Sequence, residues 1–245
     1  MKLKLTYIIS ISFLMHSFLL HSQTIPTATD STFLKTNRYG LWVGVDLDRL
    51  RRIAIDKNYS GLELTGQYRL TKKMFLAAEL GNEKITQNDS QLSTTTSGTF
   101  ITAGFNYNLY TNWLDMENQI YLGMRYGVSS FSQTLNSYEI YDPNPYFPNP
   151  NPIIESDISE SGLAAQWAEV VMGLNVKVYN NIFVGFSLNM NVLLTNETPS
   201  NFDNLYIPGF NRTYNGDFGA GFNYTVSYFI PIYKKKNIID TLPKK

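Results

Sequence analysis

Two segments near the C-terminal end alternate between apolar and small polar residues, and this alternation constrains the fold more than any other feature. In residues 182–194 every even position is apolar, whereas most odd positions hold Gly, Ser or Asn. Residues 218–232 repeat the pattern, with Gly, Asn, Thr or Ser at the odd positions from 219 to 227. Successive side chains of a β-strand point to opposite faces, so each segment predicts a strand with one apolar face and one small, polar face.

Six earlier segments alternate in the same way, which brings the number of predicted strands to eight. They cover residues 41–48, 62–70, 74–81, 101–109, 119–128 and 169–178. The connections are alternately short (71–73, 110–115 and 179–181) and long (49–60, 84–98, 129–161 and 195–216). Short turns on one side and long loops on the other are typical of outer-membrane barrels. The pattern predicts an all-β fold, an eight-stranded antiparallel up-and-down transmembrane β-barrel.

The N-terminal stretch has the organisation of an export signal. Lys2 and Lys4 precede an apolar run over residues 5–20, and Ser22 marks a plausible cleavage site before Gln23. The alternative, a retained membrane helix, requires roughly 20 apolar residues, and this run is shorter. We therefore predict a signal peptide (1–22), a periplasmic linker (23–38), an outer-membrane barrel (39–233) and a periplasmic tail (234–245) in a Gram-negative bacterium.

The composition excludes several classes of function. Removing a leader with two lysines from a chain of 20 basic and 20 acidic residues leaves a net charge near −2, and no basic patch for nucleic acid remains. The chain has no Cys, and its two histidines, His16 and His21, lie in the predicted signal peptide. The mature chain thus lacks the usual general base and the commonest zinc ligands. We expect no catalytic residue, no metal site and no cofactor.

The same alternation could describe a soluble periplasmic barrel that binds a lipid in an apolar interior. The outer face of such a barrel would be rich in Lys and Glu, but here the polar face is mostly Gly, Asn, Ser and Thr, which suits a crowded lumen. Aromatic residues also gather at the strand ends, with Tyr39, Tyr107 and Tyr110 at one end and Tyr59 and Trp167 at the other. They predict the two interfacial girdles of a spanning barrel.

Charged residues on the polar face define the candidate site in the lumen. By register the inward residues are Asp46, Glu63, Arg69, Glu79, Arg125, Glu169 and Lys177. Carboxylates in a confined interior must be paired, hydrated or protonated. One interpretation is a charge network that plugs and stabilises the barrel. The other is a narrow, cation-preferring pore or solute-binding lumen.

The fourth long loop holds a second candidate site. Its aromatic residues include Phe202, Tyr206, Phe210 and Tyr214. They could form a surface that binds an extracellular partner, or they could pack on one another and order the loop.

The chain resembles two known groups. In architecture it is similar to the small eight-stranded barrels of the OmpA and OmpX type, and Gly221-x-x-Tyr224-x-Val226-x-Tyr228 resembles the C-terminal signal that the barrel-assembly machinery reads. Residues 39–46, 59–64 and 75–81 resemble an uncharacterised barrel family of Bacteroides-type bacteria, domain of unknown function 6048. The motifs of this resemblance are structural and name no activity. From the sequence as a whole we predict a monomeric, non-catalytic barrel in the lipid bilayer, with a structural or adhesive role exercised through extracellular loops towards an unknown partner.

Overall fold

The structure is a computed structural model that describes residues 34–89, 91–111, 117–140, 153–199, 204–212 and 217–238. Residues 35–237 form one compact unit, to which the description below applies. The predicted signal peptide and its cleavage site lie outside the described residues. No helix in the described ranges is long and apolar enough to cross a membrane.

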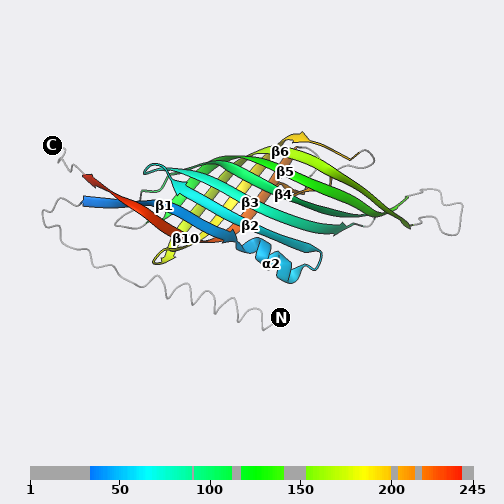
Figure 1. Cartoon of the computed structure of the whole chain (residues 1–245), viewed down its shortest axis with the longest axis horizontal. Coiled ribbons are helices and arrows are strands. Elements are labelled where there is room, and N and C mark those ends of the chain that lie inside the picture. Colours follow the sequence, from blue (N-terminus) through cyan, green and yellow to red (C-terminus); the bar gives the residue numbers. More distant parts are fainter. Residues whose placement is uncertain are drawn as a thin grey trace, which may run out of the picture. The chain divides into compact units, whose positions relative to one another are not determined.

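Eight antiparallel strands form a closed barrel (Figure 1). They are β1 (Leu34–Asp46), β2 (Tyr59–Arg69), β3 (Met74–Asn88), β4 (Leu92–Asn108), β5 (Gln119–Glu139), β6 (Ile153–Tyr179), β7 (Ile182–Asn196) and β10 (Phe218–Ile238). Strands adjacent in this list are adjacent in the barrel, and β10 closes the ring between β7 and β1. The predicted eight-stranded, up-and-down fold is therefore confirmed.

The apolar face of the strands points outward. In β5, buried and exposed residues alternate without interruption from Gln119 to Ser130. The exposed apolar side chains form a lipid-facing belt that includes Val43, Leu62, Leu64, Leu76, Leu80, Ile101, Leu122, Met124, Met172, Leu188, Met190 and Phe222. In water such a surface would be highly unfavourable, so the barrel crosses a membrane and does not enclose an apolar ligand.

Two of the predicted long loops are mostly strand. The described parts of the ranges 84–98 and 129–161, predicted as loops, instead mostly continue β3, β4, β5 and β6, and pairing reaches Asn88↔Ser93 and Glu139↔Ile153. These extensions lie beyond the belt, so their outer faces carry polar residues and the alternation on which the prediction relied is lost. β1 begins at Leu34 and β10 ends at Ile238, so these strands extend beyond the predicted barrel bounds of 39 and 233.

The other two long connections contain short elements. The predicted loop 49–60 overlaps helix α2 (Leu47–Ile55), which follows β1 directly and begins with Asp46 as its N-cap. The Asp46 carboxylate accepts a 2.7 Å hydrogen bond from the Asp48 N–H, a usual device for starting a helix. The predicted loop 195–216 contains a small hairpin of β8 (Tyr206–Ile207) and β9 (Asn211–Arg212).

Candidate functional site: charged clusters in the barrel lumen

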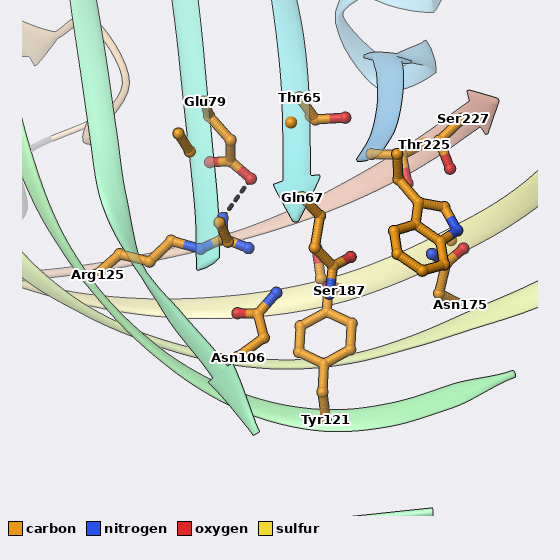
Figure 2. A pocket seen from close by; sticks show the side chains of 15 residues that line it. Thr65, Gln67, Glu79, Asn106, Tyr121, Arg125, Asn175, Ser187, Thr225 and Ser227 are labelled. Atoms are coloured by element: carbon orange, nitrogen blue, oxygen red, sulfur yellow. Dashed lines mark hydrogen bonds and ion pairs between the residues drawn. The ribbon is translucent and has the colours of Figure 1, made fainter. Parts of the chain in front are cut away.

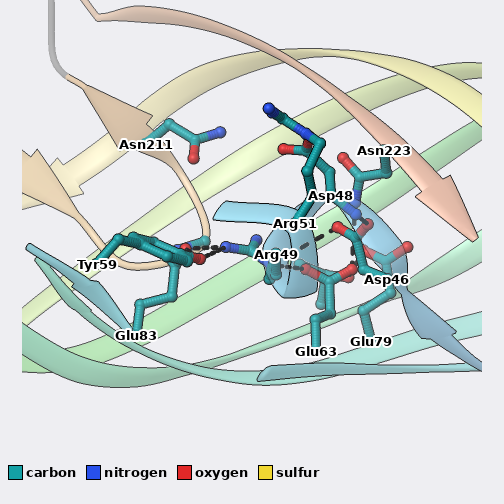
Figure 3. A network of polar contacts seen from close by, with 12 residues as sticks. Asp46, Asp48, Arg49, Arg51, Tyr59, Glu63, Glu79, Glu83, Asn211 and Asn223 are labelled. Carbon is teal, nitrogen blue, oxygen red and sulfur yellow. Dashed lines mark hydrogen bonds and ion pairs between the residues drawn. The ribbon is translucent and has the colours of Figure 1, made fainter. Parts of the chain in front are cut away.

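The centre of the first cluster is Arg49 on α2, whose side chain points into the barrel (Figure 3). Its Nε donates to the Glu63 carboxylate at 2.6 Å, and its Nη1 pairs with Glu83 on β3. The Asp46 carboxylate lies 3.8 Å from Nε. The guanidinium group also lies over the ring of Phe100, 4.9 Å from its centroid. One helix residue thus links β1, β2, β3 and β4 across the lumen.

Glu83 is the most heavily hydrogen-bonded carboxylate of this cluster. Besides Arg49, it accepts hydrogen bonds from the Tyr59 hydroxyl at 2.6 Å and the Tyr206 hydroxyl at 3.1 Å. The N–H of Gly209 donates to its other oxygen at 2.9 Å. Glu83 is fully buried, and four donors compensate for its lost hydration. Burial raises the pKa of Tyr206, so its hydroxyl stays protonated and remains a donor.

A second cluster lies on the walls formed by β3 to β6. Arg125 on β5 pairs with Glu79 on β3, which also accepts a 3.1 Å hydrogen bond from the Thr102 hydroxyl. Glu169 is directly opposite Arg125 in the β5–β6 register and is buried. The two clusters together hold four buried carboxylates, Asp46, Glu63, Glu83 and Glu169, and the partly buried Glu79 around two guanidinium groups.

Beside the second cluster lies a small polar cavity (Figure 2). Its volume is about 40 Å³, and Glu79, Arg125, Asn106, Tyr121 and Gln67 are among its lining residues. A polar cavity of this size is large enough for a few water molecules. It has no room for a solute of metabolite size, which counts against a solute-binding lumen.

An aromatic cluster closes the lumen on the side of the short turns. Trp42, Phe75, Phe183 and Phe229 come from β1, β3, β7 and β10, and each is at most 2% exposed. The ring centroids of Trp42 and Phe229 are 4.1 Å apart, and Trp42 meets Phe75 and Phe183 edge-on at 5.7 and 5.9 Å. Rings from β3 and from the three neighbouring strands β7, β10 and β1 pack together inside the barrel at this level.

A second apolar cluster closes the opposite side, and the β8–β9 hairpin supplies part of it. Its members are Phe100, Phe131, Leu163, Ala165, Trp167, Ile207 and Phe210. Phe210 and Ile207 are fully buried, and the ring of Phe210 meets that of Trp167 at a centroid distance of 6.0 Å. The hairpin therefore folds back into the barrel mouth.

This arrangement corrects the predicted interaction surface in the fourth loop. Tyr206 and Phe210 are buried, so neither offers a surface to a partner. The alternative prediction, that these rings order the loop, is closer to the observed structure. The two side chains pack against the inside of the barrel and not only on one another. Phe202 and Tyr214 lie outside the described residues. Tyr39, Tyr59 and Trp167 were predicted in the girdles and are likewise inward and buried.

The predicted lumen residues separate into two levels. Asp46, Glu63, Arg125 and Glu169 are buried and Glu79 is partly buried, with Asp46 and Glu63 in the Arg49 cluster and the other three in the Arg125 cluster. Arg69 lies at the short-turn end, where it donates to the backbone carbonyls of Arg38, Thr71 and Lys72 and stacks over Phe75. Lys177 is only half-buried.

Sequence reasoning missed the two residues that organise the first cluster. Arg49 was assigned to a loop because its neighbours do not alternate. Glu83 fell just beyond the predicted end of the third strand, although it continues the inward series of Glu79 and Gly81 in steps of two. Extending that period past the apolar belt would have found Glu83.

The C-terminal residues of the predicted assembly signal lie on β10. Tyr224 and Tyr228 are exposed on the lipid-facing side, about half of each side chain being accessible. Gly221 faces the lumen beside the side chains of Asn189 and Asn211.

Comparisons with known proteins give distant structural similarities. Neisserial surface protein A is 10% identical with a TM-score of 0.42, and the match covers 80% of this chain and 99% of that one. Ail, the attachment invasion locus protein of Yersinia pestis, is 11% identical with a TM-score of 0.39, covering 80% and 99%. CarO2 of Acinetobacter baumannii is 10% identical with a TM-score of 0.36, covering 80% and 100%. No curated protein matches the sequence.

The family itself is identified by sequence. Residues 4–235 match the model of the domain of unknown function DUF6048. The match covers nearly the whole chain and confirms the resemblance seen in the barrel strands. The chain belongs to the DUF6048 family of β-barrel proteins.

Proposed function

We propose that this protein is a non-catalytic, monomeric barrel of the outer membrane with a closed lumen, and that it acts through the part of β3 to β6 that extends beyond the membrane. The observation that carries the proposal is the filling of the lumen. The Arg49 cluster, the aromatic cluster around Trp42 and the hairpin residues Ile207 and Phe210 occupy successive levels. A barrel filled in this way conducts poorly, so the surface outside the lipid is left to carry the activity.

The strand extension offers a specific surface for a partner. β6 pairs with β7 only from Ala165 onward, whereas its residues 153–163 pair with β5 alone among the described residues. A strand edge with no neighbouring strand among the described residues, as at 153–159, binds an extended segment of another protein through backbone hydrogen bonds. Glu155 and Asp157 are exposed along it, which favours a segment with Lys or Arg side chains. The edge is interrupted at Asp157 and Gly162, whose φ angles are +48° and +78°.

The first experiment tests the closed barrel. Outer-membrane fractions of expressing cells are run on a gel with and without boiling, and the purified protein is recorded in planar bilayers. We expect a heat-shifted band in the outer-membrane fraction and no conductance steps. Regular cation-selective steps would favour the pore instead, and recovery as a soluble protein without detergent would contradict both.

The second experiment tests the strand edge. Gln133 and Glu160 face each other in the β5–β6 register, so an Asn-Gly turn can join them and remove residues 134–159 without disturbing the pairing below. A phage-displayed peptide library is selected on the wild-type barrel in nanodiscs and counter-selected on this shortened variant. We expect extended peptides with basic residues that bind only the wild type. If no peptide distinguishes the two barrels while both show the heat shift, the edge is not a binding surface.

The assembly signal remains a further part of the proposal. We expect Tyr224, Tyr228 and Val226 to be read by the barrel-assembly machinery, with Gly221 giving the strand its small inward face. Substituting both tyrosines by Ser should lower the amount of folded barrel in the membrane without changing the stability of the barrel that does fold. Unchanged amounts would remove this role.

A further inference from the structure

Helix α2 has its polar side towards the barrel and its apolar side away from it. Arg49 is buried in the lumen cluster and Arg52 is half-buried, its guanidinium carbon 3.7 Å from the centre of the Tyr59 ring. Leu47, Leu50 and Ile53 are 38, 40 and 43% exposed. They are spaced by three residues and so lie along one side of the helix. A surface helix of a water-soluble protein has the reverse orientation, with its apolar side on the core.

The helix occupies a place in the barrel wall. β1 pairs with β2 only as far as Val45↔Leu64, whereas β2 continues to Tyr59 along β3. At residues 59–63 of β2, helix α2 therefore lies on the side where β1 would otherwise pair. Asp46, Arg49, Glu63 and Asn223 gather on the inner side of the helix (Figure 3), and Asn223 of β10 donates to Glu63 at 3.2 Å.

The exposed side of α2 continues the lipid-facing belt. Val43 precedes the helix on β1 and is 43% exposed, and Leu62 on β2 is 47% exposed. The last pair between β1 and β2 is Val45↔Leu64, and Leu47 and Leu62 each lie two residues beyond it. Leu47 on the helix and Leu62 on β2 therefore lie at similar heights along the barrel. The apolar side chains of the helix thus extend a surface that already contacts lipid, and a helix with one apolar side is suited to lie at a membrane interface.

From this continuity we propose that α2 is a lipid-contacting part of the wall, with Leu47, Leu50 and Ile53 inserted among the acyl chains of the outer leaflet. The proposal rests on the membrane-spanning barrel proposed above and specifies how its wall is completed. The ion pairs of Arg49 hold the helix from the lumen, and lipid covers it from outside. The occupant is the bilayer, not a second copy of the chain or another protein.

The absence of cysteine allows a direct test, because a single introduced thiol can be labelled. Leu50→Cys is labelled with an environment-sensitive fluorophore and the protein is refolded into phosphatidylcholine vesicles. Leu64→Cys, in the belt, is the control for lipid contact. Ser161→Cys, exposed on β6 beyond its pairing with β7, is the control for water. Brominated phosphatidylcholine quenches a label in lipid, and iodide quenches a label in water.

We expect the label at position 50 to lose fluorescence with brominated lipid as the label at position 64 does, and to resist iodide. Iodide quenching equal to that at position 161, with normal lipid quenching at position 64, would overturn the proposal for α2 alone. Loss of lipid quenching at position 64 as well would overturn the membrane-spanning barrel. A third outcome would be that the unlabelled Leu50→Cys protein forms disulfide-linked dimers in vesicles and that brominated lipid does not quench the labelled protein. This result would show that a second copy of the chain covers the helix instead.

Discussion

The hydroxyl of Tyr206 donates a 3.1 Å hydrogen bond to the carboxylate of Glu83, although the two residues are 123 positions apart in the sequence. The bond connects the β8–β9 hairpin to the same carboxylate that pairs with Arg49 on α2. The β8–β9 hairpin and helix α2, which belong to different connections between strands, therefore both contact the buried side chain of Glu83. The hairpin and the helix are expected to loosen together when that side chain is removed.

Glu83→Ala is predicted to destabilise the barrel strongly. It removes one carboxylate from the buried guanidinium of Arg49 and leaves the hydroxyls of Tyr59 and Tyr206 without this acceptor. Loss of one partner of a buried ion pair costs about 3–5 kcal/mol. Urea unfolding in vesicles, followed by the heat shift on gels, measures the change.

Asp48→Asn is the matched control for Glu83→Ala. Asp48 pairs at 2.7 Å with Arg51, whose side chain is 56% exposed, so the change should cost less than about 1 kcal/mol. Equal effects of the two substitutions would mean that the Arg49 cluster contributes no more to stability than a surface pair.

The sequence was sufficient for the barrel but not for its filling. The outward apolar residues recur in steps of two because lipid imposes the same requirement on every strand, so Leu122 and Met190 could each be placed without the rest of the fold. No such period governs Arg49, whose partners lie on β2 and β3 and became neighbours only when the ring closed. Tyr206 and Phe210 were misplaced for a related reason. An aromatic residue in a polar segment suits either an exposed loop or a hairpin folded into the mouth, and only the Glu83 and Trp167 contacts decide between them.

Phe210→Ala is predicted to release the hairpin while leaving the barrel wall intact. The ring is fully buried against Trp167, and removing a buried Phe ring costs about 3–5 kcal/mol. Most of that loss falls on the attachment of the hairpin, which is then left with buried Ile207 and the hydrogen bonds of Tyr206 and Gly209 to Glu83. Limited trypsin digestion of vesicles should then cleave after Arg212, with the heat shift retained. Resistance equal to that of the wild type would show that other contacts hold the hairpin.

Trp42→Ala is predicted to open the lumen on the side of the short turns. The indole is 2% exposed and contacts Phe75, Phe183 and Phe229, so its removal leaves a void within the aromatic cluster and costs about 3–5 kcal/mol. In planar bilayers the double variant Trp42→Ala/Phe210→Ala should show conductance steps that neither single variant shows, because removing both apolar clusters leaves only the polar side chains of the charged clusters across the lumen. Steps in the Trp42→Ala single variant would mean that the hairpin does not close its end.

Gly127→Ala is predicted to prevent folding of the barrel, because Trp167 leaves no room for a side chain there. A Cβ at position 127 would lie 2.1 Å from the Trp167 ring, which is fully buried and directly opposite in the β5–β6 register. The ring cannot move away, since Phe210 and its neighbours pack around it.

Gly66→Ala is the control, because the nearest atom to its added Cβ would be 3.8 Å away. The folded fraction on unboiled gels should fall sharply for Gly127→Ala and stay near that of the wild type for Gly66→Ala. A normal folded fraction for Gly127→Ala would mean that the Trp167 ring can take another position. The apolar cluster at the barrel mouth would then be packed less tightly around Trp167 than the structure indicates.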